Sequence, residues 1–307
     1  FGRVLVMING QRLNNPDMSG VNLASVPVES IDRIEILDGA ASAVYGDNAV
    51  GGVINIITKE SSEPLVLMGG ISIGSSWSNG VHFGYIASED SSGFSLFVDD
   101  TNTSGWRERT KNKTFNALAS GYIDITDRIT IKPFFNMTDT SYELPGSLTQ
   151  EQYKSNTKKA YSLDDEGEKQ IAGGGLSLDW QILDCLTFVM PIDAGYKKTK
   201  FNTGSYYSYT DAVQKNVNVR PVFKFAESFD KDFALSMSAG CDFSYVNLDA
   251  AGYSEKSRIN KTSDTKINQY MSAPYVLASV DLPYQVKLEG AARYDTETIK
   301  VASSEDL

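Results

Sequence analysis

Residues 233–245 read FALSMSAGCDFSY. Every second residue from Phe233 to Tyr245 is apolar, and the residues between them are small or polar. Because successive side chains of a strand point to opposite faces, this alternation places one face against an apolar medium and the other against a polar one. We therefore expect a long strand that separates two environments.

The same alternation recurs on both sides of this stretch. It is clearest over residues 186–196 and 129–137. We expect about eleven strands, over residues 65–74, 80–88, 93–100, 113–125, 128–138, 170–181, 186–199, 214–227, 233–247, 268–282 and 284–300. Strands of this length fit a tilted crossing of a bilayer.

The connections between these strands differ in length in a regular way. Short ones are expected at 126–127, 183–185, 228–232 and 283–284. Long polar ones are expected at 101–112, 139–169, 200–213 and 248–267. Outer-membrane barrels have short periplasmic turns and long external loops, whereas a soluble β-sandwich has no physical reason to collect its long loops at one end. The pattern predicts a mainly β fold, an antiparallel transmembrane β-barrel, over residues 61–307.

Composition excludes several function classes. The 307 residues include 39 acidic and 28 basic ones, a balance unsuited to nucleic-acid binding. The aromatic residues, 16 Tyr, 14 Phe and 3 Trp, suit the aromatic girdles of a membrane barrel. His82 is the one histidine, and Cys185 and Cys241 form no C-x-x-C pattern, which favours two unpaired thiols. We expect no metal site, no cofactor and no enzyme activity.

Residues 1–60 follow a different pattern. They predict a strand over 4–8, a turn at Asn9-Gly10, a return strand over 11–13, a helix over 27–34 and strands over 34–37 and 51–58. Asn-Gly favours a tight hairpin because both residues tolerate a positive φ. Ser25 is the expected helix cap, with Pro27 in the first turn. This region is expected to form a separate small α+β domain.

Three stretches of this region carry a family resemblance. They are VLVMINGQRL at 4–13, VESIDRIEILDG at 28–39 and ASAVYGDNAVGGVINIITK at 41–59. In this order they resemble the C-terminal part of the plug domain of TonB-dependent outer-membrane receptors. The matching residues, expected to be structural, are Asn9, Gly10, Arg33, Glu35, Gly39, Tyr45, Gly46, Gly51, Gly52 and Asn55.

The resemblance implies that part of the protein lies outside this sequence. Barrels of this family close with about 22 strands, so residues 61–307 would be the N-terminal half of the barrel, behind part of an α+β plug domain at 1–60. About eleven strands would leave open edges, which hydrocarbon does not tolerate. The TonB box is absent from the sequence. Asp38 stands where the family often has a basic residue that pairs with barrel carboxylates, so we expect no such lock there.

The function implied is TonB-dependent active import of an iron-siderophore-type chelate across the outer membrane of a diderm bacterium. The expected partners are the TonB-ExbB-ExbD system, outer-membrane lipid including lipopolysaccharide, and the small-molecule metal chelate. Cobalamin import remains an alternative, as does a passive porin or adhesin barrel, although a passive pore would not need a plug. A soluble carbohydrate-binding β-protein is the last alternative.

A polar loop follows the predicted hairpin, at the place where the family has an apical substrate loop. Its residues offer hydrogen-bonding groups and one adaptable apolar contact, and binding residues concentrate on such loops. The predicted substrate contacts are Asn14, Asn15, Pro16, Asp17, Met18 and Ser19. An ordinary turn-rich connection remains the alternative. In the region 139–169, mixed charge favours a solvated loop over a ligand site, and Trp106 is expected to be a membrane-interface anchor.

Overall fold

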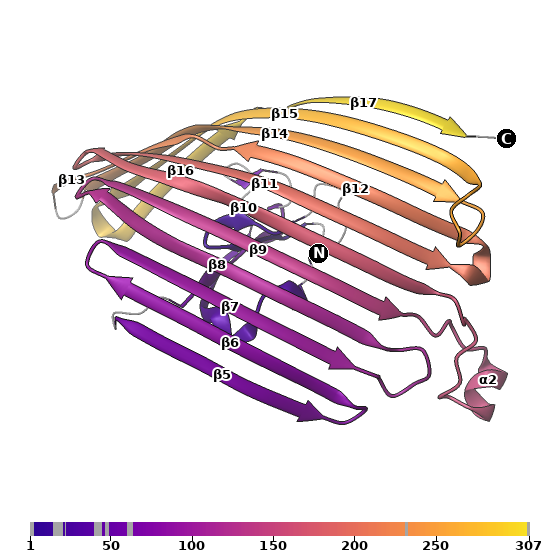
Figure 1. Ribbon diagram of the computed structural model, residues 1–307. Helices are drawn as coiled ribbons and strands as arrows, with labels where there is room; N and C mark the ends of the chain where they lie inside the picture. The colour runs from indigo at the N-terminus through magenta and orange to yellow at the C-terminus, as the bar shows by residue number, and fades with distance from the viewer. Residues whose placement is uncertain are drawn as a thin grey trace.

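A computed structural model describes residues 3–14, 21, 23–39, 45–46, 49–59, 64–230 and 233–305. A large, curved antiparallel sheet makes up most of the molecule (Figure 1). A small four-stranded sheet formed by the N-terminal region packs against its concave side. Within the described ranges, we find no helix with the length and apolar character that a bilayer crossing requires.

The large sheet is an antiparallel meander in which neighbouring positions follow one another along the chain. Its strands are β5 (Leu65–Gly74), β6 (Ser78–Glu89), β7 (Ser92–Thr103), β8 (Asn112–Thr126), β9 (Ile129–Glu143), β10 (Glu166–Leu183), β11 (Leu186–Thr203), β12 (Ser208–Val219), β13 (Val222–Asp230), β14 (Phe233–Tyr253), β15 (Lys261–Leu282), β16 (Val286–Arg293) and β17 (Thr296–Glu305). The sheet order runs without crossover from β5 to β16.

Two of the predicted strands are each divided into two elements. β12 and β13 both lie between β11 and β14, and β16 and β17 both pair with β15. Pro221 lies between β12 and β13 and has no backbone N–H to donate to the ladder. The register is the same on both sides, since Val219 pairs with Phe243 and Val222 with Gly240. The thirteen strands therefore fill eleven positions, as predicted.

The long and short connections lie at opposite ends of the sheet, as predicted. The long ones, however, were predicted too long: they span 104–111, 144–165, 204–207 and 254–260. The strands continue past their apolar part, because backbone ladder bonds form whether or not the side chains are apolar. The longest connection contains the short helix α2 (Gln150–Ser155), which starts with a capping box between Thr149 and Gln152.

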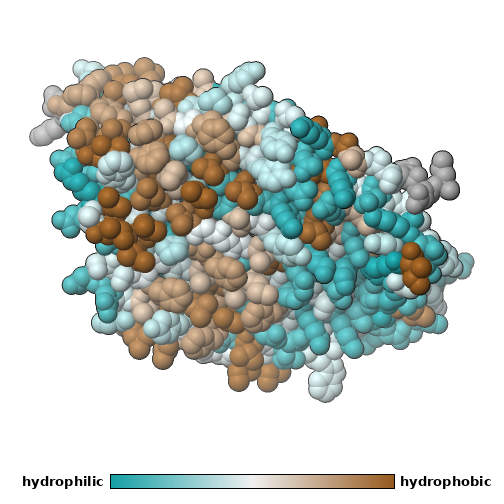
Figure 2. Space-filling model, turned by 45° about the horizontal axis from the view of Figure 1, so that its top comes forward, coloured by the Kyte–Doolittle hydropathy of each residue, from teal (hydrophilic) through white to brown (hydrophobic). Residues whose placement is uncertain are grey.

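The alternating stretch of β14 turns its apolar side chains outward. Phe233, Met237 and Phe243 are 39%, 42% and 48% exposed on the convex face, whereas Asp242 between them is buried on the concave face. Figure 2 shows hydrophobic side chains gathered over one part of this outer surface and hydrophilic ones toward the end that carries α2. A soluble sandwich would bury the apolar series, so this arrangement is the inverse of a water-soluble core.

The small sheet has the order β2-β1-β4-β3. Its strands are β1 (Leu5–Ile8), β2 (Gln11–Arg12), β3 (Ile31–Asp38) and β4 (Gly52–Thr58). β1 runs parallel to β4, and the other pairs are antiparallel. β4 ends at Thr58 and β5 begins at Leu65, so the predicted domain boundary near residue 60 lies between the two sheets.

The predicted helix over 27–34 is wrong. The structure has two single 3-10 turns, η1 (Leu23–Ser25) and η2 (Val28–Ser30), and β3 begins directly afterwards. Pro27 precedes η2 without a side-chain cap, and Ser25 ends η1 instead of capping a helix. The β-branched residues at 31, 34 and 36 favour a strand once β4 is available as a partner.

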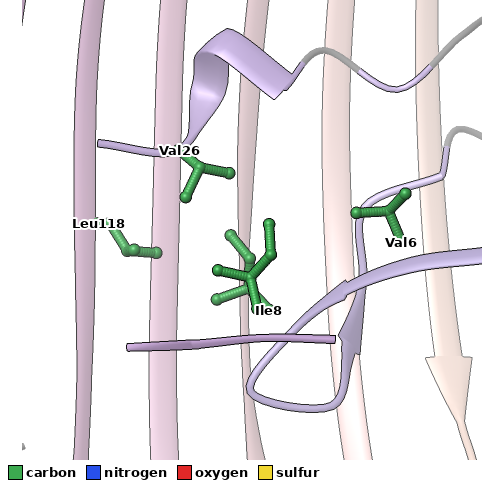
Figure 3. Close-up of a cluster of buried hydrophobic side chains, with 5 residues drawn as sticks. Val6, Ile8, Val26 and Leu118 are labelled. Atoms are coloured by element: carbon green, nitrogen blue, oxygen red, sulfur yellow. The ribbon is translucent and has the colours of Figure 1, made fainter. Parts of the chain in front are cut away.

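β1 forms the centre of the small sheet's core, because its two faces pack into two apolar clusters. One cluster contains Leu5, Met7, Ala49 and Val53. The other contains Val6, Ile8, Val26 and Ile56 together with Leu118 of β8 (Figure 3). Burial of such a side chain contributes about 1.5–3 kcal/mol. Leu118 therefore attaches the small sheet to the concave face of the large one.

Candidate functional site

The turn between β1 and β2 is fastened to β4. Asn9 and Gly10 adopt φ values of 47° and 79°, as the Asn-Gly signal predicts. Asn9 Nδ2 donates to Thr58 Oγ1 at 2.8 Å, and the Thr58 amide donates back to Asn9 Oδ1 at 3.0 Å. The Gly10 amide donates to Asn55 Oδ1 at 3.1 Å. Three predicted motif residues thus meet at this turn and have a structural role.

Asn14, the first residue of the predicted substrate loop, is bonded within the small sheet. Its Oδ1 accepts from the Val6 amide at 2.7 Å, and its Nδ2 donates to the Val4 carbonyl at 3.0 Å. The side chain thus continues the hydrogen bonding of β2 along β1. Asn15, Pro16, Asp17, Met18 and Ser19 lie outside the described residues, so substrate contact by this loop remains a prediction.

The charged motif residues Arg33 and Glu35 form local pairs on an exposed surface of the small sheet. Arg33 pairs with Glu35 at 2.9 Å and with Asp32 at 3.1 Å. Glu35 also accepts from Asn55 Nδ2 at 3.3 Å. These residues hold β3 beside β4 and do not approach the large sheet.

Glycines of the motif allow close backbone contacts. Gly52 has a φ of 132°, and a Cβ there would lie 2.7 Å from the Leu37 carbonyl oxygen. A Cβ at Gly51 would lie 3.1 Å from the Arg3 carbonyl oxygen, and Gly39 has a φ of 97°. Close packing accounts for glycine at 51 and 52, whereas at Gly39 the positive φ accounts for it.

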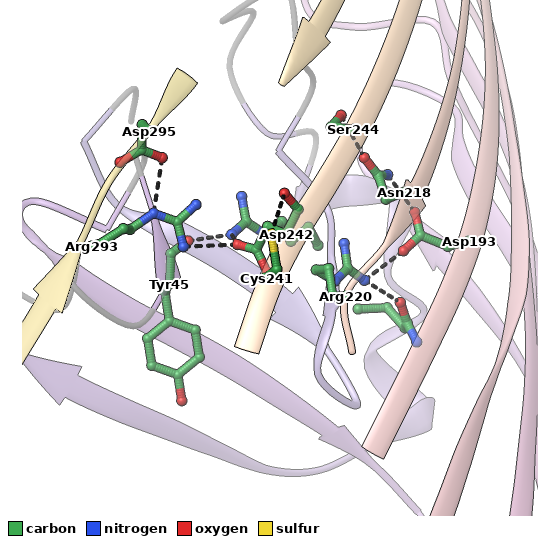
Figure 4. Close-up of polar contacts among 11 residues, drawn as sticks. Tyr45, Asp193, Asn218, Arg220, Cys241, Asp242, Ser244, Arg293 and Asp295 are labelled. Carbon is green, nitrogen blue, oxygen red and sulfur yellow. Dashed lines mark hydrogen bonds and ion pairs between the residues drawn. The ribbon is translucent and has the colours of Figure 1, made fainter. Parts of the chain in front are cut away.

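One carboxylate of the large sheet joins the two sheets. Asp242, on the concave face of β14, accepts from Arg293 Nη1 at 2.9 Å and lies 3.6 Å from Arg12 Nη2 (Figure 4). The side chains of Asp242 and Arg293 are only 7% and 5% exposed. Arg12 also donates to the Tyr45 carbonyl. We call Arg12, Asp242 and Arg293 the Asp242 cluster.

Gly46, another motif residue, makes room for this cluster. It has a φ of 79°, and a Cβ there would lie 2.9 Å from Arg293 Nη2. Arg293 is further held by Asp295, whose Oδ1 accepts from its Nε at 2.9 Å (Figure 4). Arg12 of the small sheet and Arg293 of the large sheet therefore both lie against the motif stretch Tyr45-Gly46.

A second polar contact between the sheets lies beside the first. Arg220 Nη2 donates to Gln11 Oε1 of β2 at 2.9 Å and also to Asp193 of β11 (Figure 4). Asp193 in turn accepts from Asn218 Nδ2 at 2.6 Å. Arg220 occupies the gap between β12 and β13, where its amide donates to the Pro191 carbonyl at 3.0 Å. We call Gln11, Asp193 and Arg220 the Arg220 cluster.

The small sheet is also attached at strands β6 to β8. Asn116 Nδ2 donates to the Ala24 carbonyl at 2.8 Å and contacts both oxygens of Asp99. Farther along, Glu29 Oε1 lies 3.6 Å from His82 Nδ1. The predicted structural role of His82 agrees with this position.

The contacts between the sheets were not identified from the sequence. Asp38 is exposed in β3 and pairs through its backbone with Gly52. Arg12, which lies in β2 after the Asn9-Gly10 turn, forms the ion pair between the two sheets with Asp242. The sequence did mark the position of the wall carboxylate, since Asp242 is the one charged residue in the alternating stretch 233–245. Its partners could not be inferred, because Arg12 and Arg293 lie on other strands.

Two cavities separate the small sheet from the concave wall. The outer one, on the side of the long connections, has a volume of about 160 Å³ and is lined by Asn14, Lys197, Gln214 and Asn216, among others. The inner one, toward the short turns, has a volume of about 970 Å³. Its polar lining includes Lys59, Asp124, Lys132, Asp179 and Lys224. The small sheet therefore lies between an outer and an inner cavity.

Arginines fasten the long connections to one another. Arg107 donates to the carbonyls of Gly146, Pro145 and Lys159 at 2.7–3.3 Å. Arg109 donates to Glu143 at 3.3 Å. These arginines support the connections 104–111 and 144–165, while Trp106 stays 63% exposed.

Asp165 joins the connection 144–165 to the next one. It accepts from the Ser205 amide at 3.0 Å and from Ser205 Oγ at 2.7 Å. Burial opposes the charged form, but hydrogen bonds from Ser205, Ser162 and the Gly204 amide together outweigh it and hold the pKa of Asp165 below its usual range. Nearby, Lys256 lies 2.8 Å from Glu166, and this hydrogen bond raises the pKa of Lys256.

Metal and thiol chemistry finds little support in the part of the chain that the structure describes. There, no group of three or more His, Cys, Asp or Glu side chains is placed to hold a metal ion. Cys185 and Cys241 are free thiols. The described residues thus form a concave wall, a small sheet packed against it and two cavities between them.

Known proteins share both parts of this arrangement. Residues 1–53 match the family model of the TonB-dependent Receptor Plug Domain. Over 55 residues, 18% of this chain, the sequence is 44% identical to the Vitamin B12 transporter BtuB of Photobacterium profundum. This match covers 9% of that transporter. The family-model match thus covers most of the small sheet.

Solved structures resemble almost the whole chain. The ferric citrate transporter FecA in its unliganded form matches with a TM-score of 0.81 over 99% of this chain, at 15% identity. The ferric-catecholate import receptor Fiu of E. coli K12 in its closed form matches with a TM-score of 0.75 over 97%, also at 15% identity. The chain spans about half of each, 48% and 49%. At this identity the likeness shows the fold.

Proposed function

We propose that this chain, which carries part of the plug and part of the barrel of a TonB-dependent receptor, acts in TonB-driven import of an iron-siderophore-type chelate across the outer membrane of a diderm bacterium. In this proposal the small sheet is the plug segment and the large sheet the barrel segment. The observation that carries it is a plug segment that lies between two cavities and is joined to the wall by the Arg12–Asp242 ion pair and the Gln11–Arg220 hydrogen bond.

The outward-facing apolar side chains support a membrane location. Lipid would cover the convex face, on which Phe243 is 48% exposed, and water would fill the concave side, on which Asp242 is buried. The long connections would face outward and the short turns the periplasm. Lipopolysaccharide would surround the outer half of the barrel.

An external energy source is consistent with how the plug segment is held. Passage from the outer to the inner cavity requires contacts such as Arg12–Asp242 and Gln11–Arg220 to be broken. Hydrogen bonds to charged groups contribute about 1.5–3 kcal/mol each. Thermal fluctuation would rarely break several together, whereas a pull by the TonB-ExbB-ExbD system would supply the work. A passive porin has no need of such a plug.

The proposed ligand class rests on the lining of the outer cavity. Arg12, Lys197 and Arg220 line it together with Asp193 and Asp242, so arginine and lysine outnumber the carboxylates there. Positively charged donors of this kind suit carboxylate or catecholate oxygens of an iron chelate. Cobalamin is the alternative, because 55 residues of this chain are 44% identical to a vitamin B12 transporter.

Binding and uptake measurements test the proposal. The complete gene product, purified in detergent, is titrated with ferric citrate, a ferric catecholate and cobalamin while tryptophan fluorescence is followed. We expect quenching by an iron chelate and uptake of that chelate only in cells with a functional TonB system. Tight binding of cobalamin without a response to iron chelates would reverse the ligand assignment. Equal uptake without TonB would indicate a passive pore.

A further inference from the structure

Only a thin partition separates the two cavities. The residues that line both of them are Gln11, Arg12, Phe134, Arg220 and Asp242. Two of these, Gln11 and Arg12, are the whole of strand β2. The other three belong to the concave wall. The boundary between the outer and the inner space therefore runs where β2 meets Arg220 and Asp242.

β2 is held much less firmly than the rest of the plug segment. It is an edge strand that pairs only with β1 among the described strands, through Met7–Arg12 and Ile8–Gln11. β1 is buried on both faces and pairs with β4 over four residues. A force on the plug segment would detach β2 before it detached β1, because β2 has two ladder pairs and its two residues belong to neither apolar cluster, whereas β1 pairs on both sides and lies in both clusters.

The wall keeps its charges paired when β2 is absent. Asp242 retains Arg293 at 2.9 Å, and Arg220 retains Asp193. Separation of β2 from the wall therefore leaves no unpaired buried charge on the wall, which is the costly outcome when a buried ion pair is broken. The two wall arginines thus serve as reserve partners for the carboxylates.

We propose that β2 is a movable partition, and that its displacement from Arg220 and Asp242 joins the two cavities while β1, β3 and β4 stay in place. β2 moves away from β1 between two points that stay fastened: the Asn9-Gly10 turn, bonded to Thr58 and Asn55, and Asn14, bonded to Val4 and Val6. The inference rests on the proposed function, since it describes where the transport path opens. It assigns gating to a two-residue strand and not to the plug as a whole.

Two crosslinks distinguish the movement of β2 from movement of the whole plug segment. Both are made in the complete gene product after Cys185→Ser and Cys241→Ser. The first joins Gln11→Cys to Arg220→Cys with a short bis-maleimide that spans the replaced side chains. The second joins Glu29→Cys to His82→Cys, a contact of the plug segment at the opposite wall. Uptake is measured before and after crosslinking, in cells, with a ferric chelate or cobalamin as the probe.

We expect the first crosslink to reduce uptake at least tenfold and the second to leave it within twofold. Loss of uptake with both crosslinks would show that the plug segment moves as one body, and would overturn the inference. Unchanged uptake with the first crosslink would also overturn it. A crosslink between Tyr245→Cys and Asn268→Cys, neighbours at 2.9 Å on strands β14 and β15, controls for chemical damage.

A ligand-independent measurement keeps the partition testable if uptake fails. If the uncrosslinked variants take up neither probe, the proposed function is wrong, whereas the partition is still tested by ion conductance in planar bilayers. We expect Gln11→Ala/Arg12→Ala to open frequent conductance steps that the exposed variant Arg33→Ala lacks. Equal, low conductance of both variants, with unchanged thermal unfolding, would overturn the partition.

Discussion

Arg12 of the plug segment lies 3.6 Å from Asp242 of the barrel segment, and the same carboxylate oxygen accepts a hydrogen bond from Arg293. One buried acid thus neutralises two arginines, of which only one belongs to the plug segment. The plug is therefore attached to a charge that the wall already stabilises. Four predictions test this arrangement and its surroundings.

Replacement of the shared carboxylate, Asp242→Asn, is expected to destabilise the protein by about 3–5 kcal/mol, the usual cost of leaving a buried charge without its partner. Arg293 is 5% exposed and would lose its most buried counter-ion. Thermal or urea unfolding in micelles, followed by circular dichroism, measures the change. The exposed Asp38→Asn is the matched control. Equal stability of the two variants would contradict the central role of Asp242.

Two substitutions at Asn9 separate the effect of its side-chain hydrogen bonds from the effect of its backbone conformation. Asn9→Gly keeps the positive φ of 47° and removes only the bonds to Thr58. Asn9→Ala removes the bonds and adds the strain of a left-handed residue, about 1–2 kcal/mol. We expect the free energy of unfolding of Asn9→Ala to be lower than that of Asn9→Gly by this amount, as measured by hydrogen exchange of the β1 and β4 amides. The same exchange rates in both variants would show that the backbone conformation is not strained.

Gly52→Ala is expected to disturb the pairing of β3 with β4. The φ of 132° is unfavourable for alanine, and its Cβ would lie 2.7 Å from the Leu37 carbonyl oxygen, which is backbone and cannot rotate away. The cost should be about 1–3 kcal/mol. Gly290→Ala is the control, because a Cβ there meets nothing within 4 Å. The free energies of unfolding of the two variants should therefore differ clearly.

Acid should loosen the connection 144–165. Hydrogen bonds from Ser205 lower the pKa of Asp165, so this carboxylate stabilises the folded loop at pH values above its unfolded pKa of about 3.9. The contribution disappears as the pH falls through the lowered folded pKa. Hydrogen exchange of the loop, measured between neutral pH and strong acid, should show this loss. In Asp165→Asn the connection should exchange rapidly already at neutral pH. The same pH dependence in this variant as in the unsubstituted protein would contradict the assignment to Asp165.

Local patterns account for the parts of the fold that were predicted correctly. The two-residue period of 233–245 and its relatives gave eleven strand positions and the direction of each face, since both follow from the pleat of a single strand. The Asn9-Gly10 turn was predictable because its signal is the conformational tolerance of two residues.

The errors share a cause. The helix expected over 27–34 is a 3-10 turn followed by β3, because pairing with β4 outweighs the local tendency. The long connections were predicted too long because hydrophobic alternation ends before the backbone ladder does. In both cases the deciding partner is a neighbouring strand whose position a linear pattern does not give.

The sequence by itself determined that apolar and polar faces alternate along many strands, and that a glycine-rich plug motif precedes them. Only the tertiary structure decided that Arg12 and Gln11 meet Asp242 and Arg220, and that these contacts divide the inner space in two. The physical reason is the distance along the sequence between the residues on which each feature depends. Strand period and turn conformation depend on adjacent residues, whereas a buried ion pair depends on which distant strands curvature of the sheet brings around the plug segment.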